Sequence, residues 1–254
     1  MSRRFDTRTN VFNQNGRINQ IEYAIRAIKN SGPSLAISFK NGIVVATEKP
    51  KGSKLMVNKP RGDKIHKIDD HVYCVVSGLT ADANYLLEYL RNESQKYFSK
   101  FEEEIVLEQL VERVCDLKQS YTQSGGMRPF GTSFIFLGRD FSEGFQIWTS
   151  DPSGNMFSWK AIAQGSNEEN ANNFLKDNYK EDLEEEEALH LVVKGLMQTL
   201  DTSSPELERI EVALVRKPEL ETSGSCCRVD FEFLEKDKIA RIVENVNKEI
   251  KEEK

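Results

Sequence analysis

Pairs of β-strands alternate with pairs of helices along this sequence, and that order limits the fold more than any other feature. Apolar patterning predicts strands at 35–39, 43–47, 63–68, 71–78, 131–140, 143–151, 208–217 and 227–234, with one or two short strands within 155–165. Helical spacing predicts helices at 17–30, 80–98, 106–122, 168–179 and 184–200, and a last one from 236. Two antiparallel sheets, each with one face to cover, would pack together and take the helices outside. We therefore predict an α+β fold, a four-layer α-β-β-α sandwich of two antiparallel sheets.

The first two predicted strands are joined by a turn that contains Asn41-Gly42. Asn-Gly between apolar, β-branched runs is a strong hairpin signal because both residues tolerate a positive φ. The helix before this hairpin is amphipathic, and Gly32-Pro33 stops it. In the later helix 106–122, helical spacing places Leu117 on the buried side.

No linker rich in Pro, Gly or Ser interrupts the chain, so we expect one domain over residues 15–234. Residues 15–31 carry its first helix, and the polar residues 1–14 precede it as a tail. Residues 235–254 form a charged helical extension after the domain.

Composition argues against several classes of function. The formal net charge of −6 disfavours general binding to nucleic acids or anionic membranes. No apolar run approaches the ~20 residues that a membrane span needs. The four cysteines and three histidines show no metal-ligand spacing, and the glycine motifs for nucleotide binding are missing from the sequence. We therefore expect reduced thiols, no metal and no cofactor.

Two further stretches have a functional and a simpler interpretation. The glutamates at 184–187 resemble a cation site, but acidic residues that open a helix more simply favour the positive end of its dipole. Ser153 lies between polar neighbours in Asp-Pro-Ser-Gly-Asn, where Pro and Gly occupy the positions that a type I turn prefers. Both stretches are interpreted as structural.

A hairpin like the first one also opens the fold of the amino-terminal nucleophile hydrolases, whose first strand begins with a catalytic Ser, Thr or Cys. Such an enzyme uses its own α-amine as a base. Here Gly32 has no side chain, Pro33 offers no nucleophile and Ser34 lies inside the strand. We therefore expect no catalysis at this end. The alternative, a self-processed hydrolase, requires a mature chain that starts near Gly32 and discards the helix 17–30.

Four separated motifs together resemble one family: VFNQNGRINQIEYA at 11–24, SGLTADANYL at 77–86, YTQSGGMRPFGTS at 121–133 and DPSGNMFSWKA at 151–161. In content and order they are similar to the α-type subunits of the 20S proteasome core particle, over about residues 5–233. The resemblance implies the same sandwich and a subunit that is not a peptidase. Seven such subunits form an outer ring that templates the β ring, restricts entry to the chamber and docks regulators.

The resemblance also implies partners and a location. The partners are other α subunits in the heptameric ring, β subunits of the inner ring, and regulatory-particle ATPases or other activators that insert their C-terminal tails. Nucleic acids, membranes and cofactors are not among them. The implied location is the cytoplasm and nucleus, in ubiquitin-dependent and ubiquitin-independent protein degradation.

The same family binds activator tails in a pocket where a lysine captures the terminal carboxylate. The matching positions of this chain are Gly16, Glu22, Gly32, Lys64 and Leu79. Without the resemblance, Lys64 is more simply interpreted as a solvated lysine at the end of a strand.

The family's gate is implied at Phe5, Asp6, Gln14 and Tyr23. Asp6 and Tyr23 match the family pattern, while Phe5 replaces a tyrosine and Gln14 replaces a proline. Phe5 lacks the hydroxyl donor, and Gln14 frees a φ angle that proline fixes. We expect details of the gate to differ in this subunit.

Overall fold

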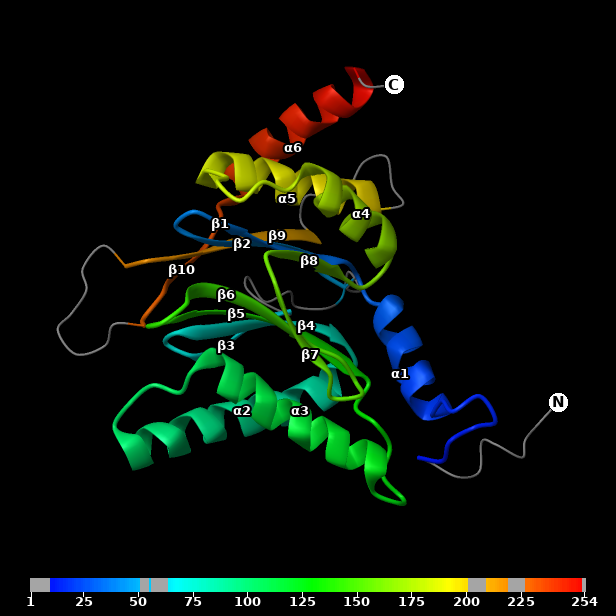
Figure 1. Ribbon diagram of the computed structural model, residues 1–254. Helices are drawn as coiled ribbons and strands as arrows, with labels where there is room; N and C mark the ends of the chain where they lie inside the picture. The colour runs from blue at the N-terminus through cyan, green and yellow to red at the C-terminus, as the bar shows by residue number, and fades with distance from the viewer. Residues whose placement is uncertain (1–9, 51–54, 56–63, 201–208, 219–226, 253–254) are drawn as a thin grey trace.

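Two five-stranded antiparallel sheets, packed face to face, form the centre of the molecule (Figure 1). The computed structural model describes residues 10–50, 55, 64–200, 209–218 and 227–252. Helices cover the outer face of each sheet, so the layers run α-β-β-α. The sandwich predicted from the order of elements is confirmed.

The first sheet has the strand order β10-β9-β2-β1-β8. Its strands are β1 (Ser34–Phe39), β2 (Gly42–Glu48), β8 (Ala161–Gln164), β9 (Ile210–Arg216) and β10 (Asp230–Phe233). β1 and β2 are buried on both faces, because helices cover one face and the second sheet covers the other. Their near-continuous apolar sequences follow from this double burial.

The second sheet has the order β3-β4-β5-β6-β7. Its strands are β3 (Ile65–Asp69), β4 (Val72–Gly78), β5 (Thr132–Asp140), β6 (Gly144–Ser150) and β7 (Met156–Trp159). Although β7 and β8 follow each other in the chain, they belong to different sheets, and the chain passes from one sheet to the other between them. Residues 155–165 thus form two strands rather than one.

Each helix layer lies on one sheet (Figure 1). Helices α2 (Thr80–Phe101) and α3 (Leu107–Gln123) cover the second sheet. Helices α4 (Glu168–Asn178) and α5 (Glu185–Thr199) cover the first sheet, and α6 (Lys236–Glu252) packs against α5. The remaining helix, α1 (Asn19–Lys29), flanks the sandwich beside β4 and β5.

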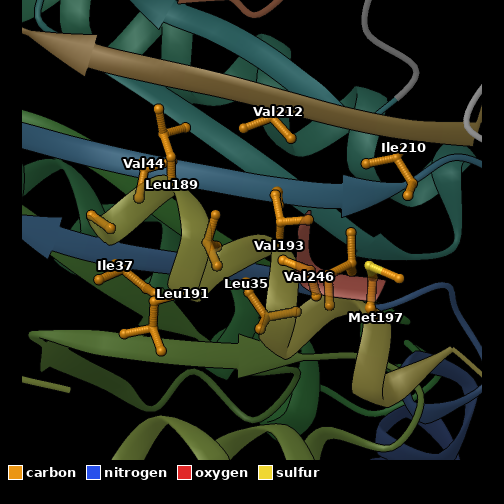
Figure 2. Packing of buried hydrophobic residues seen from close by; sticks show 14 of the residues in the cluster. Leu35, Ile37, Val44, Leu189, Leu191, Val193, Met197, Ile210, Val212 and Val246 are labelled. Atoms are coloured by element: carbon orange, nitrogen blue, oxygen red, sulfur yellow. The ribbon is translucent and has the colours of Figure 1, made fainter. Parts of the chain in front are cut away.

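Figure 2 shows the apolar layer between α5 and the first sheet. Leu35, Ile37 and Val44 of the sheet pack with Val193 of α5, and all four are buried. The neighbouring Ala36 faces the second sheet instead, as the two-residue period of a strand requires. Burying a side chain such as Leu35 contributes about 1.5–3 kcal/mol relative to leaving it exposed.

The first hairpin has a different turn from the one predicted. Gly42 already pairs with Phe39 as the first residue of β2, so Lys40 and Asn41 form the loop. Neither Asn41 nor Gly42 has a positive φ. The prediction that Asn-Gly occurs here because both residues tolerate a positive φ was therefore wrong. A Cβ atom on Gly42 would lie 2.2 Å from the carbonyl oxygen of Val215. The close approach of β9 is what requires glycine here.

The glutamates at 184–187 stabilise the start of α5, as the simpler interpretation predicted. Glu184 and Glu187 form a capping box, in which each side chain accepts a hydrogen bond from the backbone amide of the other residue.

The charged extension expected over 235–254 is packed along part of its length. Ile239, Val243 and Val246 of α6 are buried in the apolar layer of α5. Near the end of α6, Lys194 of α5 forms an ion pair with Glu249 at 3.3 Å. These contacts make α6 a component of the fold, and its apolar residues at helical spacing were the sequence signal for it.

One polar side chain lies in the core where apolar packing was predicted. Lys118 of α3 is fully buried, whereas Leu117 is only partly buried. The Lys118 ammonium donates hydrogen bonds to the carbonyl oxygen of Thr132 at 3.2 Å and to Oγ of Ser150 at 2.8 Å. It also lies 4.7 Å from the centre of the Phe134 ring. Burial lowers the pKa of Lys118 to about 8.

This buried lysine predicts a pH dependence of stability. Between the folded pKa near 8 and the unfolded pKa of 10.5, the unfolded state binds more protons than the folded state. The free energy of unfolding should therefore rise with pH across this window, by up to about 3 kcal/mol from Lys118. Urea unfolding below pH 8 and near pH 10 should show a smaller rise for Lys118→Met than for the wild type. Lys176→Met, at an exposed lysine, is the control, and equal rises for Lys118→Met and wild type would contradict the prediction.

Candidate functional site

The functional site predicted from the sequence lies where the chain leaves α1 and enters β1. Helix α1 ends at Lys29, and the amide of Ser31 donates to the carbonyl oxygen of Ile28 at 2.9 Å. Gly32 and Pro33 follow, and β1 begins at Ser34. The pair therefore stops the helix, as predicted, and joins α1 directly to the sheet.

The head of β1 offers no accessible nucleophile. Ser34 is fully buried, and its hydroxyl lies 2.7 Å from the hydroxyl of Thr47 on β2. A Cβ atom on Gly32 would lie 3.0 Å from the carbonyl oxygen of Glu48, 3.1 Å from its carboxylate and 3.3 Å from Nζ of Lys64. The space that a side chain at position 32 would need is already filled by these two neighbours.

Lys64 is an interior residue rather than a solvated one. It precedes β3, and only 7% of it is exposed. Its ammonium donates a hydrogen bond to the carbonyl oxygen of Gly32 and lies 3.4 Å from Oγ of Ser34. Burial lowers the pKa of Lys64 to about 8, Glu48 opposes that shift, and the positive charge of Arg209 adds to it. The solvated-lysine interpretation is wrong.

Four more charged side chains accompany Lys64. Nη2 of Arg209 lies 2.6 Å from the carboxylate of Glu48, and the ammonium of Lys49 lies 2.6 Å from the carboxylate of Glu211. Three cations therefore face two carboxylates, a net charge of +1. Glu48 and Arg209 meet because β2 pairs with β9, a pairing of distant segments that no local motif reveals.

A cleft of about 650 Å³ opens over this cluster. Glu48, Lys64 and Arg209 line it, together with Gly78 and Thr80. An open cleft with excess positive charge and a buried ammonium suits a carboxylate ligand.

The comparisons with known proteins point to one family. A family model described as proteasome subunit matches residues 28–215. Proteasome subunit alpha type-4 of Petunia hybrida is 47% identical over 215 residues, which cover 85% of this chain and 86% of the relative. Proteasome subunit alpha type-4-A of Arabidopsis thaliana is 47% identical with the same coverage. Probable proteasome subunit alpha type-3 of Schizosaccharomyces pombe is 45% identical over 226 residues, or 89% of this chain and 91% of the relative.

The chain belongs to the proteasome subunit family. The resemblance found in its motifs is confirmed, and the similar relatives are α-type subunits by name. Within the α type, residues 1–4, 115–123 and 150–161 look most like type 4 of eukaryotes, the subunit named α3 by its ring position. Two of these three relatives carry the name type-4, in agreement.

The structure gathers some residues of the implied docking pocket and separates others. Gly32 and Lys64 are in contact, and Leu79 lies in the chain between Gly78 and Thr80, two residues that line the cleft. Gly16 lies in the turn before α1 with a φ of +71°, and Glu22 pairs with Arg17 at 3.8 Å near the start of that helix. Gly32 and Lys64 lie beyond the opposite end of α1, whose 11 residues span about 16 Å.

Of the implied gate residues, Phe5 and Asp6 fall outside the described residues. Gln14 is exposed in the turn before α1. Tyr23 is also exposed, and the guanidinium of Arg26 lies 5.9 Å from the centre of its ring.

A residue that the sequence analysis did not single out fixes the chain in front of α1. Nδ2 of Asn10 donates to the carbonyl oxygens of Tyr121 at 3.1 Å, Ser124 at 2.6 Å and Met127 at 3.3 Å. These carbonyls belong to the end of α3 and the turn after it. Asn10 also has a φ of +65°, a conformation that asparagine adopts more readily than most residues. One side chain therefore anchors the start of the described chain to α3.

A serine and the cysteines, whose side chains could take part in chemistry, have structural surroundings instead. The Ser153 hydroxyl donates to the carboxylate of Asp151 at 2.6 Å within its own turn, as predicted. Cys74 and Cys115 are free and buried, Cys227 is also buried, and burial raises the pKa of Cys115 to about 11. Across the described ranges, no group of three His, Cys, Asp or Glu residues is arranged to hold a metal ion, and no helix could cross a membrane.

Because the space beside Gly32 is filled, we expect any side chain at this position to lower the stability of the protein. Gly32→Ala brings a methyl group within 3.0–3.3 Å of Glu48 and Lys64, so these groups must shift. We expect a loss of about 1–3 kcal/mol in the free energy of unfolding, measured in urea. Gly125→Ala is the matched control, because no atom lies within 4 Å of a Cβ at that position. Equal stability of the two variants would show that position 32 has room.

Proposed function

We propose that this chain is a non-catalytic α-ring subunit of the 20S proteasome. One observation carries the proposal: Gly32, two residues before β1, has no side chain, and Glu48 and Lys64 occupy the space where one would lie. The names of the relatives support the α type. In this role the chain builds the heptameric outer ring with other α subunits and contacts the β subunits of the inner ring. We further propose that it works in the cytoplasm and nucleus, which microscopy of the tagged subunit tests.

The alternative is a self-processed hydrolase. It requires cleavage near Gly32 and removal of α1, whose Ile28 is buried against the sandwich beside Gly78. An intact mass of the assembled subunit decides between the two: a mass without residues 1–31 would refute the non-catalytic role, and a mass that includes them excludes self-processing.

The proposed docking role follows from the cleft at Lys64. Its positive charges attract the terminal carboxylate of an activator tail. Leu79, which is 49% exposed, follows Gly78 in the chain, and Gly78 lines the cleft. Because the ammonium of Lys64 bonds within the chain, a bound carboxylate shares it with the Gly32 carbonyl oxygen or displaces that contact. Gly16 and Glu22 lie away from this cleft, and we propose that they contact a longer stretch of the tail.

Loss of the Lys64 charge tests this role. In the assembled particle, Lys64→Ala and the bulkier Lys64→Met should lower regulator-stimulated peptide hydrolysis, because the tail carboxylate loses its cation. Lys40→Met is the control, since Lys40 is an exposed lysine at the far end of β1 that pairs with Glu184 at 3.2 Å. Unchanged stimulation of both Lys64 variants by every regulator would defeat the docking role.

The residues before Asn10 are proposed to restrict entry to the chamber. Their polar composition and the anchored position of Asn10 support this role. Deletion of residues 2–9 should raise basal peptide hydrolysis of the particle, because the obstructing segment is gone. A tail of equal length built from Gly and Ser separates bulk obstruction from specific contacts. No rise after the deletion, in particles with intact assembly, would mean that this tail does not gate.

A further inference from the structure

A second cleft, at the other end of β1, has a chemical character of its own. It has a volume of about 680 Å³ and lies where the chain passes from β7 in one sheet to β8 in the other. Lys160 stands at this crossing, and its carbonyl oxygen accepts a hydrogen bond from the amide of Ser38 near the end of β1 at 2.8 Å. The cleft is therefore built by elements of both sheets, and it is distinct from the cleft at Lys64.

Aromatic rings form much of its lining: Phe145, Trp148, Trp159 and Tyr179. Both indole N–H groups are already bonded within the chain, from Trp148 to Gln146 at 2.6 Å and from Trp159 to Thr149 at 2.8 Å. These bonds fix the orientation of the indoles. What the indoles can still offer a ligand is therefore the π-electron face rather than a donor.

The charges of the cleft are predominantly negative. Its lining carries the carboxylates of Glu108, Glu143 and Glu181 and the single ammonium of Lys160. Lys160 is paired with Glu181. Glu108 and Glu143 form no ion pair within the part of the chain that the structure describes. Two carboxylates thus stand beside aromatic faces without an ion-pair partner among the described residues.

The chain itself shows that one of these rings accepts a guanidinium. Arg139 of β5 lies with its guanidinium carbon 5.8 Å from the centre of the Phe145 ring. An arginine or lysine is attracted to aromatic faces by the ring quadrupole and to carboxylates by charge, and both features meet in this cleft. An acidic segment would be repelled, and a neutral apolar segment would leave the carboxylates without partners.

We propose that this cleft binds an arginine or lysine side chain from a basic segment of a partner protein. The cation lies among the aromatic rings, and its charge is balanced by Glu108 and Glu143. This site is independent of the proposed docking role of Lys64, since it lies at the opposite end of β1 and selects the opposite charge.

The two tryptophans of the chain both line this cleft, so their fluorescence reports on it selectively. The full-length chain is titrated at low salt with an acetylated, amidated Gly-Arg repeat peptide and with the same peptide carrying neutral citrulline. We expect a saturable change in tryptophan emission with the arginine peptide only. Added salt should weaken it, because screening reduces the attraction between the charges.

Matched variants test the contribution of each group. Glu108→Gln with Glu143→Gln should weaken binding about fivefold or more, from the loss of two charge contacts. The control is Glu88→Gln with Glu112→Gln, which removes two exposed carboxylates from the α2 and α3 layer. Tyr179→Leu should also weaken binding, and Tyr179→Phe should restore it, because phenylalanine returns the ring face.

Several outcomes would overturn the proposal. These are no emission change at millimolar arginine peptide, an equal response to the citrulline peptide, or equal affinity of the Glu108/Glu143 variant and its control. An emission change that depends on the concentration of the chain alone would assign the cleft to a second copy instead. Each variant is checked by urea unfolding, so that a misfolded protein is not counted as a loss of binding.

Discussion

The packing of the two sheets on each other is the constraint on which the rest of the molecule depends. Their inner faces meet through buried apolar side chains, among them Ala36, Val45, Val75 and Ile135. Because helices cover the outer face of the first sheet as well, β1 has no face in contact with water. Polar chemistry near this strand is therefore confined to its two ends, and a cleft lies at each of them.

At the head of β1, a buried ammonium and a glycine pack against each other. Position 32 has no side chain, and the atoms of Glu48 and Lys64 occupy the space where one would lie. The buried ammonium bonds to the backbone of that same glycine, so the charged group and the missing side chain depend on each other. A cation held in such a place is stabilised by carbonyl oxygens and carboxylates nearby, and it is positioned at the floor of an open, positively charged cleft.

The sequence predicted most of the fold because its information is local and periodic. The two-residue period of strands and the 3.6-residue period of helices placed nearly every element, and Gly32-Pro33 marked the junction of α1 with the sheet. The sequence did not predict the features that depend on contacts between segments distant in the chain. Glycine is required at position 42 because β9 approaches closely there, and the pairing of Glu48 with Arg209 depends on the register between β2 and β9. Lys118 is buried at a helical position where the neighbouring residues predict an apolar side chain. Of the implied docking residues, only Lys64 and Gly32 are brought into contact within one chain, and the resemblance could not reveal this without coordinates.

The three hydrogen bonds of Asn10 tie the start of the described chain to a helix that is distant in sequence. Since Nδ2 of Asn10 is held by the carbonyls at the end of α3, the chain in front of α1 is fixed to the layer that covers the second sheet. Asn10 and Tyr121 are 111 residues apart in the chain. A change in the turn after α3 would therefore also move the point at which the chain enters α1.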